Sequence, residues 1–212
     1  MAKLIFWDVD TQYDFMYSDG KLYVTDAELV LPNLARLTRH ARKAGIAQVA
    51  SIDYHALTDA ELSQSPDFND TFPPHCLASE PGHEKVDATR AVNPLYVDSS
   101  PDPATLDRVR AHRGEVVIRK QRFDVFTNPN TEAVLTALAP TDVAVYGVAQ
   151  DVCDRFAIEG LLARGYRVHV VRDAMKPIRP EKGEQLLADW FARGAEVVST
   201  EEVLANRLRL AR

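Results

Sequence analysis

The sequence has only two cysteines, Cys76 and Cys153, and they lie far apart in its 212 residues. Two such residues form no disulfide framework, which suits a reducing compartment where a lone thiol is either core filler or reactive. No apolar run is long enough for a signal peptide or a membrane span, and the N-terminal run over 4–9 is far too short. These absences predict a cytoplasmic protein that does not engage a membrane.

The sequence also lacks an excess of positive charge. Lys and Arg number 25 against 31 Asp and Glu, which gives a formal net charge of −6 with the two signs interleaved. Without a basic stripe the chain cannot neutralise a phosphate backbone, so we expect no nucleic-acid partner. At 212 residues the chain is long enough for one sizeable domain, which we expect to cover residues 1–212. A chain of this length buries roughly 70% of its unfolded surface and needs no disulfides.

Short β-branched apolar runs alternate with longer amphipathic runs along most of the chain. This alternation predicts a three-layer α/β/α fold in which helices cover both faces of a parallel, six-stranded sheet. The predicted strands cover 4–9, 46–52, 116–119, 143–147, 167–171 and 196–198. The predicted helices cover 27–43, 103–112, 131–138, 151–164, 181–193 and a C-terminal segment. The long irregular stretch over 53–103 is of a kind that is usually functional.

Polar residues follow the predicted strands at the ends where ligands bind in an open parallel sheet. The first strand leads into Asp10, the third ends at Lys120, and the fourth runs into Cys153 at the start of a helix. Free N–H groups and the helix dipole at that position favour a thiolate, and a nearby lysine would lower the pKa of the thiol further. This pattern supports a cysteine-nucleophile amidohydrolase in which the aspartate carries the proton. Alternatively, the thiol is core filler, the lysine forms a salt bridge and the aspartate caps a turn.

A second group of polar residues offers metal ligands. Asp53 and His55 end the second predicted strand, and an Asp-x-His pair at a strand end places both side chains on the same side of the chain. His75 and Glu61 lie in the irregular stretch that follows. Zn, Fe and Mn all accept such nitrogen and oxygen ligands. The alternative is a loop held by hydrogen bonds without a metal.

Four blocks in this order resemble the isochorismatase-like cysteine hydrolases, and within them the nicotinamidases. The blocks are Asp10-Thr-Gln-Tyr-Asp-Phe15, then Asp53-Tyr-His55 with Phe72-Pro-Pro-His75, then Arg119-Lys120-Gln-Arg-Phe, and finally Gly147-Val-Ala-Gln-Asp-Val-Cys153. Any one block is weakly specific, whereas the four together cover most of the chain.

The resemblance implies a role for each catalytic residue. It makes Asp10 the catalytic acid and base, Lys120 the catalytic lysine and Cys153 the nucleophile. It also implies a cis peptide bond between Val148 and Ala149, with the N–H groups of Ala149 and Cys153 forming the oxyanion hole. Nicotinamidases hydrolyse small amides, so the resemblance leads us to expect a nicotinamidase-like amidase. It also implies a homo-oligomer, because members of this family commonly form one.

The resemblance further implies a metal-binding loop region around 53–100. Asp53, His55 and His75 match the family pattern, whereas Glu61 falls where many nicotinamidases have a third histidine. We expect a divalent ion held by these four residues, with zinc favoured over iron or manganese. In this resemblance the metal binds the ring nitrogen of the substrate and does not activate water.

Nicotinamide or pyrazinamide is the substrate that the resemblance implies, with the carboxylic acid and ammonia as products. The tryptophan that often precedes Pro-Pro-His in nicotinamidases is Phe72 here. Phe15 and Phe72 can still stack on a flat ring. Another small amide or ureide is the alternative substrate within the same superfamily. Hydrolysis of the isochorismate vinyl ether is disfavoured, because the ether hydrolases of this type lack the cysteine that stands here at Cys153. A catalytically dead binding protein is also disfavoured, because it would not need the complete set of acid, lysine and thiol.

A distant alternative is a haloacid-dehalogenase-type phosphatase. The first strand ends in a close copy of that family's Asp-x-Asp-x-Thr motif, with Asp8 as nucleophile, Asp10 as acid and base, and Mg as cofactor. Ser51 resembles its second motif. Against this alternative, the sequence lacks a Gly-Asp block with a further carboxylate for the metal, and the alternative leaves Cys153 and His75 without a role.

Overall fold

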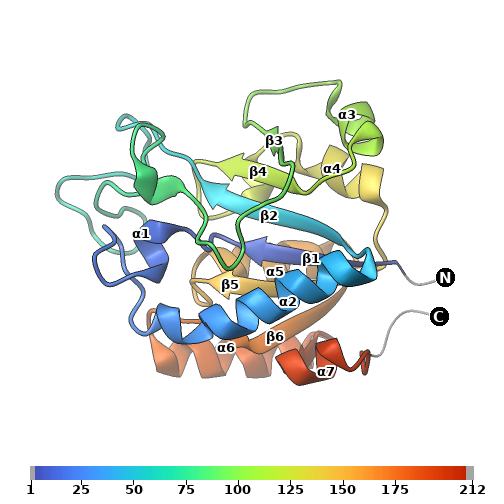
Figure 1. Ribbon diagram of the computed structural model, residues 1–212. Coiled ribbons are helices and arrows are strands. Elements are labelled where there is room, and N and C mark those ends of the chain that lie inside the picture. The colour runs from blue at the N-terminus through green and yellow to red at the C-terminus, as the bar shows by residue number, and fades with distance from the viewer. Residues whose placement is uncertain (1–2, 209–212) are drawn as a thin grey trace.

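One parallel sheet forms the centre of the molecule (Figure 1). The computed structural model describes residues 3–208. Seven strands lie in the order β3-β4-β2-β1-β5-β6-β7 within that part of the chain. The strands are β1 (Leu4–Val9), β2 (Ala47–Asp53), β3 (Leu95–Val97), β4 (Val116–Lys120), β5 (Asp142–Val148), β6 (Arg167–Lys176) and β7 (Glu196–Val198).

Helices cover both faces of this sheet, so the three-layer α/β/α arrangement is confirmed. In Figure 1, α2 and α7 lie together in front of the sheet and α5 lies behind it. None of the helices in residues 3–208 is long and apolar enough to cross a membrane. The helices are α1 (Tyr13–Met16), α2 (Leu31–Ala44), α3 (Thr105–Ala111), α4 (Thr131–Leu138), α5 (Cys153–Ala163), α6 (Pro180–Ala192) and α7 (Thr200–Leu204), with 3₁₀ turns η1 (Ala27–Val30), η2 (Pro81–His83) and η3 (Val125–Thr127).

The prediction of six strands is wrong by one. The additional strand is β3, an edge strand whose Leu95 pairs with Val116 and whose Val97 pairs with Ile118 of β4. It has three residues and lies inside the irregular stretch, where no alternation of apolar and polar residues distinguishes it from a loop. It extends the sheet without adding a residue to the site described below.

The central strands form the core because they are apolar on both faces. Every residue of β5 is buried, and Ile5, Phe6 and Trp7 of β1 have no exposed surface. Strands covered by helices on both sides have this composition, because neither face meets water. Helix α2 presents Leu34 and Leu37 to the core and ends at a left-handed glycine.

The strand register brings four strand ends to one edge of the sheet. Val9 at the end of β1 pairs with Ser51 of β2 on one side and with Gly147 of β5 on the other. Asp53 at the end of β2 pairs with Lys120 at the end of β4. After β1 the chain adds β2 on one side of that strand, and later it adds β5 on the other side. In open α/β sheets, ligands bind at the point where the strand order reverses in this way.

We expect Gly147→Ala to destabilise the fold by about 3 kcal/mol or more. Gly147 has φ +138°, and a Cβ there would lie 2.0 Å from the carbonyl oxygen of Val9 on the paired strand. Gly165→Ala is the matched control, because Gly165 has φ +80° but an added Cβ meets no atom within 4 Å. Backbone strain alone should cost the control about 1–2 kcal/mol. Urea unfolding of both variants measures the difference, and equal losses would contradict the close approach of β1 and β5.

Candidate active site

Three buried side chains from three strand ends meet at this edge of the sheet. The ammonium of Lys120, whose side chain is 1% exposed, lies 2.8 Å from Oδ2 of Asp10. The same Nζ donates a hydrogen bond to Sγ of Cys153 over 3.4 Å. It also donates to the carboxylate of Asp53. The structure therefore brings together the thiol, the ammonium and the carboxylate that the sequence singles out.

Local backbone geometry places the carboxylate and the thiol. Asp10 has φ +49°, a left-handed conformation that is uncommon outside glycine, and its N–H donates to the carbonyl of Ser51 over 3.0 Å. Cys153 is the first residue of α5, and the peptide bond between Val148 and Ala149 is cis. The carbonyl of Ala149 accepts the N–H groups of residues 152 and 154 over 2.9 and 3.2 Å. Neither bond uses the N–H of Ala149 or Cys153, the two donors expected in the oxyanion hole.

Burial sets the charge states of these groups. It raises the pKa of the Cys153 thiol well above its usual range, although the Lys120 ammonium opposes the shift. Burial also raises the pKa of Asp10, again against Lys120 and with a further contribution from Asp53. The pKa of Lys120 lies well above its usual value because Asp10 and Asp53 outweigh the effect of burial. The expectation of a thiol with a lowered pKa is therefore wrong, since loss of solvent outweighs the helix terminus and the lysine.

Four potential metal ligands form a second buried cluster that shares Asp53 with the first. One ligand atom each from Asp53, His55, Glu61 and His75 lies within 4.8 Å of all the others. Nε2 of His75 is 3.5 Å from Oδ2 of Asp53, and Nε2 of His55 is 3.9 Å from the same atom and 3.8 Å from Oε1 of Glu61. Ligands placed about 2.1 Å from a tetrahedral ion lie about 3.4 Å apart, so a small inward adjustment suffices.

The hydrogen bonding of this cluster fits a bound cation. Oδ2 of Asp53, Nε2 of His55 and Oε2 of Glu61 are buried and have no hydrogen-bond partner within the described part of the chain. Burial raises the pKa of Glu61 to about 8, and the neighbouring Asp53 carboxylate adds to the shift. A buried polar atom without a partner is costly. A divalent ion would satisfy all three atoms and keep the glutamate charged, so these residues fit the metal that the resemblance implies.

Two supporting residues escape the sequence analysis. Asp59 accepts a hydrogen bond from the Ala56 N–H over 3.0 Å, and its Oδ2 lies 3.2 Å from Nδ1 of His55. This contact orients the other ring nitrogen of His55, Nε2, toward the cluster. The side chain of Gln12 bonds the N–H and the carbonyl of Asp53, each over 2.7 Å. For Asp59, its position four residues after His55 was a usable signal in the sequence. The role of Gln12 depends on contacts that the sequence does not show.

An apolar pocket opens beside the thiol. Phe15 and Phe72 line it, together with Phe123, whose ring lies edge-on to that of Phe72 at a centroid distance of 5.6 Å. Ile178 adds a wall that sequence reasoning missed, because it comes from the loop between β6 and α6. The remaining lining residues are Leu22, Val24, Glu61, Ala149, Val152 and Cys153. Its free volume is about 30 Å³, close to that of one water, so a flat ring can lie against the sulfur only if lining side chains move outward.

The fold and this site define a class of protein, namely a three-layer α/β/α hydrolase with a buried cysteine and an adjoining set of potential metal ligands. The sequence profile of the isochorismatase domain matches residues 4–202. The chain therefore belongs to the isochorismatase family, among the isochorismatase-like cysteine hydrolases.

Individual relatives are distant. N-carbamoylsarcosine amidase of an Arthrobacter species is 24% identical over 180 residues, which is 84% of this chain, and the match spans 61% of that relative's length. Pyrazinamidase of Pyrococcus horikoshii, solved in complex with zinc, superposes with a TM-score of 0.73 at 24% identity over 93% of this chain and 99% of that one. An isochorismatase family protein of Desulfovibrio vulgaris gives a TM-score of 0.77 at 22% identity over 99% and 100% of the two chains. Likenesses at this level establish the fold.

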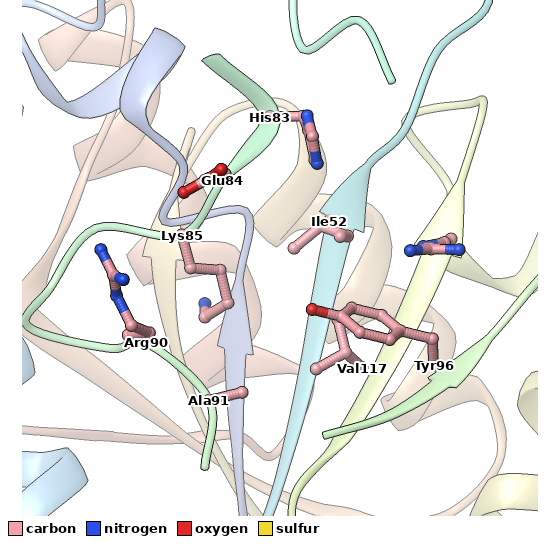
Figure 2. A pocket seen from close by; sticks show the side chains of 9 residues that line it. Ile52, His83, Glu84, Lys85, Arg90, Ala91, Tyr96 and Val117 are labelled. Carbon is pink, nitrogen blue, oxygen red and sulfur yellow. The ribbon is translucent and has the colours of Figure 1, made fainter. Parts of the chain in front are cut away.

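The phosphatase alternative is wrong, because the family match assigns the chain elsewhere and the two aspartates do not form one site. Asp8 accepts from Nζ of Lys85 over 2.7 Å and from the Thr11 hydroxyl over 2.8 Å. Figure 2 shows the lysine in a separate cavity, lined by Ile52 and Val117 from the opposite face of β2 and β4. Asp10, by contrast, contacts Lys120 in the cysteine site.

We expect Asp59→Ala to weaken divalent metal binding by about 10- to 100-fold while the fold is kept, because the mutation removes the carboxylate that orients His55. Asp107→Ala, an exposed aspartate in α3, is the control. Competition with a chromogenic chelator measures the dissociation constant for Zn²⁺. Equal affinities for the two variants would show that Asp59 does not support the metal cluster.

Proposed function

We propose that the protein hydrolyses a small carboxamide, with nicotinamide or pyrazinamide as the first candidates, to the carboxylic acid and ammonia. The observation that carries this proposal is the contact of one buried ammonium, that of Lys120, with both Cys153 and Asp10. Thiol, proton carrier and cation are then in place for attack on a carbonyl carbon. The aromatic and apolar lining of the pocket beside the sulfur supports a flat ring as the rest of the substrate.

Acylation of the cysteine is the first half of the reaction. As Sγ of Cys153 attacks the carboxamide carbon, its proton passes to Asp10, whose raised pKa makes it a better acceptor than an ordinary aspartate. Lys120 stabilises the negative charge on sulfur during this transfer. The N–H groups of Ala149 and Cys153 hold the oxyanion of the tetrahedral intermediate. Asp10 then protonates the departing nitrogen, the C–N bond breaks, and ammonia leaves a thioester.

Hydrolysis of the thioester completes the cycle. Asp10 accepts a proton from water as the water oxygen attacks the thioester carbon, and the same two N–H groups again hold the oxyanion. The C–S bond breaks, the carboxylic acid leaves, and the proton on Asp10 returns to the thiolate. The water, the amide and the products balance without an oxidant or a further reactant.

The metal cluster would position the substrate. A divalent ion held by Asp53, His55, Glu61 and His75 supplies a Lewis-acidic site for the ring nitrogen of nicotinamide or pyrazinamide. Zinc is supported by the donor set and by the zinc complex of the Pyrococcus horikoshii pyrazinamidase. Phe15 and Phe72 stack on the ring held there.

A ureide is the second candidate substrate. The observation in its favour is the 24% identity to N-carbamoylsarcosine amidase over 84% of this chain. The same thiol, aspartate and lysine would cleave its carbamoyl C–N bond by the same steps, with a carbamoyl thioester in place of the acyl one.

We expect Cys153→Ala to lower kcat for the turned-over amide by about 10⁴-fold or more, because no nucleophile remains. Cys76→Ala is the matched control, since Cys76 is also buried and its thiol donates only to the carbonyl of Gly82 over 3.9 Å, whereas the Asp14 carboxylate accepts its backbone N–H, which the mutation keeps. That control should lose about 1 kcal/mol of stability and keep its turnover.

Ammonia release from nicotinamide, pyrazinamide, a ureido acid and aliphatic amides, with and without chelator, is the measurement. Turnover of the aromatic amides that chelation lowers supports nicotinamidase-like activity. Turnover by Cys153→Ala that matches the wild type would contradict the proposal, and turnover of aliphatic amides alone, insensitive to chelator, would exclude the nicotinamide assignment.

A further inference from the structure

A cavity of about 420 Å³ adjoins the apolar pocket of the active site, and we call it the entrance cavity. The two share lining residues, so the entrance cavity continues outward from the position of the thiol. The shared residues are Phe72, Phe123, Val152 and Ile178. A substrate whose amide lies at Cys153 would therefore extend its far end into the entrance cavity.

Three cations line this cavity. Arg155 lies in the first turn of α5, two residues after Cys153. Arg179 is the N-cap residue of α6, and Lys182 lies in the first turn of the same helix. The start of each helix also carries partial positive charge. In a chain with a net charge of −6, such a concentration of positive charge beside the active site is notable.

Two of the three cations have no carboxylate partner. Nε of Arg179 lies 3.4 Å from Oδ2 of Asp151. The Asp151 carboxylate also accepts the backbone N–H groups of Ile178 and Arg179, in the loop between β6 and α6. Arg155 and Lys182 form no ion pair with any residue in 3–208. The Arg155 guanidinium lies 4.7 Å from the ring centroid of Phe156, and its Nε is buried without a hydrogen-bond partner. Asp70, the other carboxylate of the lining, pairs with none of the three.

The three cations also act on one another. Burial lowers the pKa of Lys182, and the positive charges of Arg179 and Arg155 lower it further. Asp151 and Glu159 oppose this shift but are outweighed by the two arginines, so the potential at Lys182 is positive. An anion bound in the entrance cavity would relieve that repulsion.

The separate cavity on the opposite face of the sheet provides the contrast (Figure 2). It too is lined by Lys and Arg, but each of them has a carboxylate within 2.8 Å. The pairs are Lys85 with Asp8, Arg90 with Asp87, and Arg119 with Asp98. That cavity needs no anion from solution, whereas in the entrance cavity neither Arg155 nor Lys182 has a carboxylate within ion-pair distance among residues 3–208.

We propose, on the basis of the function proposed above, that the preferred substrate is a carboxamide or ureide that carries a carboxylate at its far end. Arg155 and Lys182 bind this carboxylate in the entrance cavity and act as specificity-determining residues. Neither contacts the scissile bond, so they affect substrate affinity and leave the chemical steps to Cys153, Asp10 and Lys120.

The test compares charged and neutral substrates in matched pairs. One pair is a ring-carboxylated nicotinamide and its methyl ester, and the other is a ureido acid and its neutral methylamide. The variants are Arg155→Met, Lys182→Met and the double variant, because methionine keeps an apolar stem and removes the charge. Arg193→Met, at the far end of α6, is the control.

We expect the wild type to hydrolyse the carboxylated member of a pair with the higher kcat/KM. The double variant should raise KM for that member by about tenfold, the size expected for partly exposed charge-assisted hydrogen bonds, with kcat nearly unchanged. The neutral member and the Arg193→Met control should show no such change. Calorimetric binding to Cys153→Ala protein should give the same tenfold rise in Kd without any turnover.

Two results would overturn the inference. One is an equal loss of affinity for the charged and the neutral member in the double variant, which would indicate a purely structural role. The other is no change for either member. Failure of nicotinamide turnover in the wild type would count against the proposed function instead, because binding of the carboxylated amide to Cys153→Ala protein is measured independently of catalysis.

Discussion

The site depends on one buried ammonium. Lys120 contacts the thiol of Cys153, the carboxylate of Asp10 and the carboxylate of Asp53, and it thereby joins the proposed catalytic group to the four potential metal ligands. Two carboxylates and a thiol without solvent around them would repel one another if charged, and the cation between them makes the arrangement stable. Removal of one partner from a buried set of charges typically costs about 3–5 kcal/mol. Both the stability and the chemistry of the site therefore rest on this side chain.

The sheet supplies the positions that this interaction requires. Pairing of β1 with β2 and β5, and of β2 with β4, brings Asp10, Asp53, Lys120 and the turn before Cys153 to one edge. Burial there does more than exclude water. It raises the pKa of both the thiol and Asp10, so both groups hold a proton more tightly than usual, as the proposed proton transfer during attack requires. Outside this buried edge, the unpaired cations of the entrance cavity meet solvent and are suited to selecting a substrate by charge.

The sequence was informative where chemistry is concentrated in strand ends. Apolar periodicity predicted six of the seven strands, and the residue types after them predicted the grouping of Asp10, Lys120 and Cys153. It failed for β3, whose three residues carry no period, and for the direction of the Cys153 pKa shift, because desolvation depends on packing. Phe123 and Ile178 line the pocket with neighbours distant in sequence, and Arg155 and Lys182 meet in the entrance cavity in the same way. Spacing alone does not show whether a cation has a carboxylate partner in the fold. The sequence does not distinguish Lys85 from Lys182, although only Lys85 of the two has such a partner within residues 3–208.

The central claim is that Cys153, held between Lys120 and Asp10, forms a covalent acyl-enzyme. Intact-protein mass spectrometry after rapid acid quenching of a reaction with the turned-over amide tests it most directly. The account predicts a transient adduct with the mass of the acyl group, mapped to Cys153 and absent from Cys153→Ala protein. An adduct mapped to another residue, or steady ammonia release by Cys153→Ala protein, would contradict it.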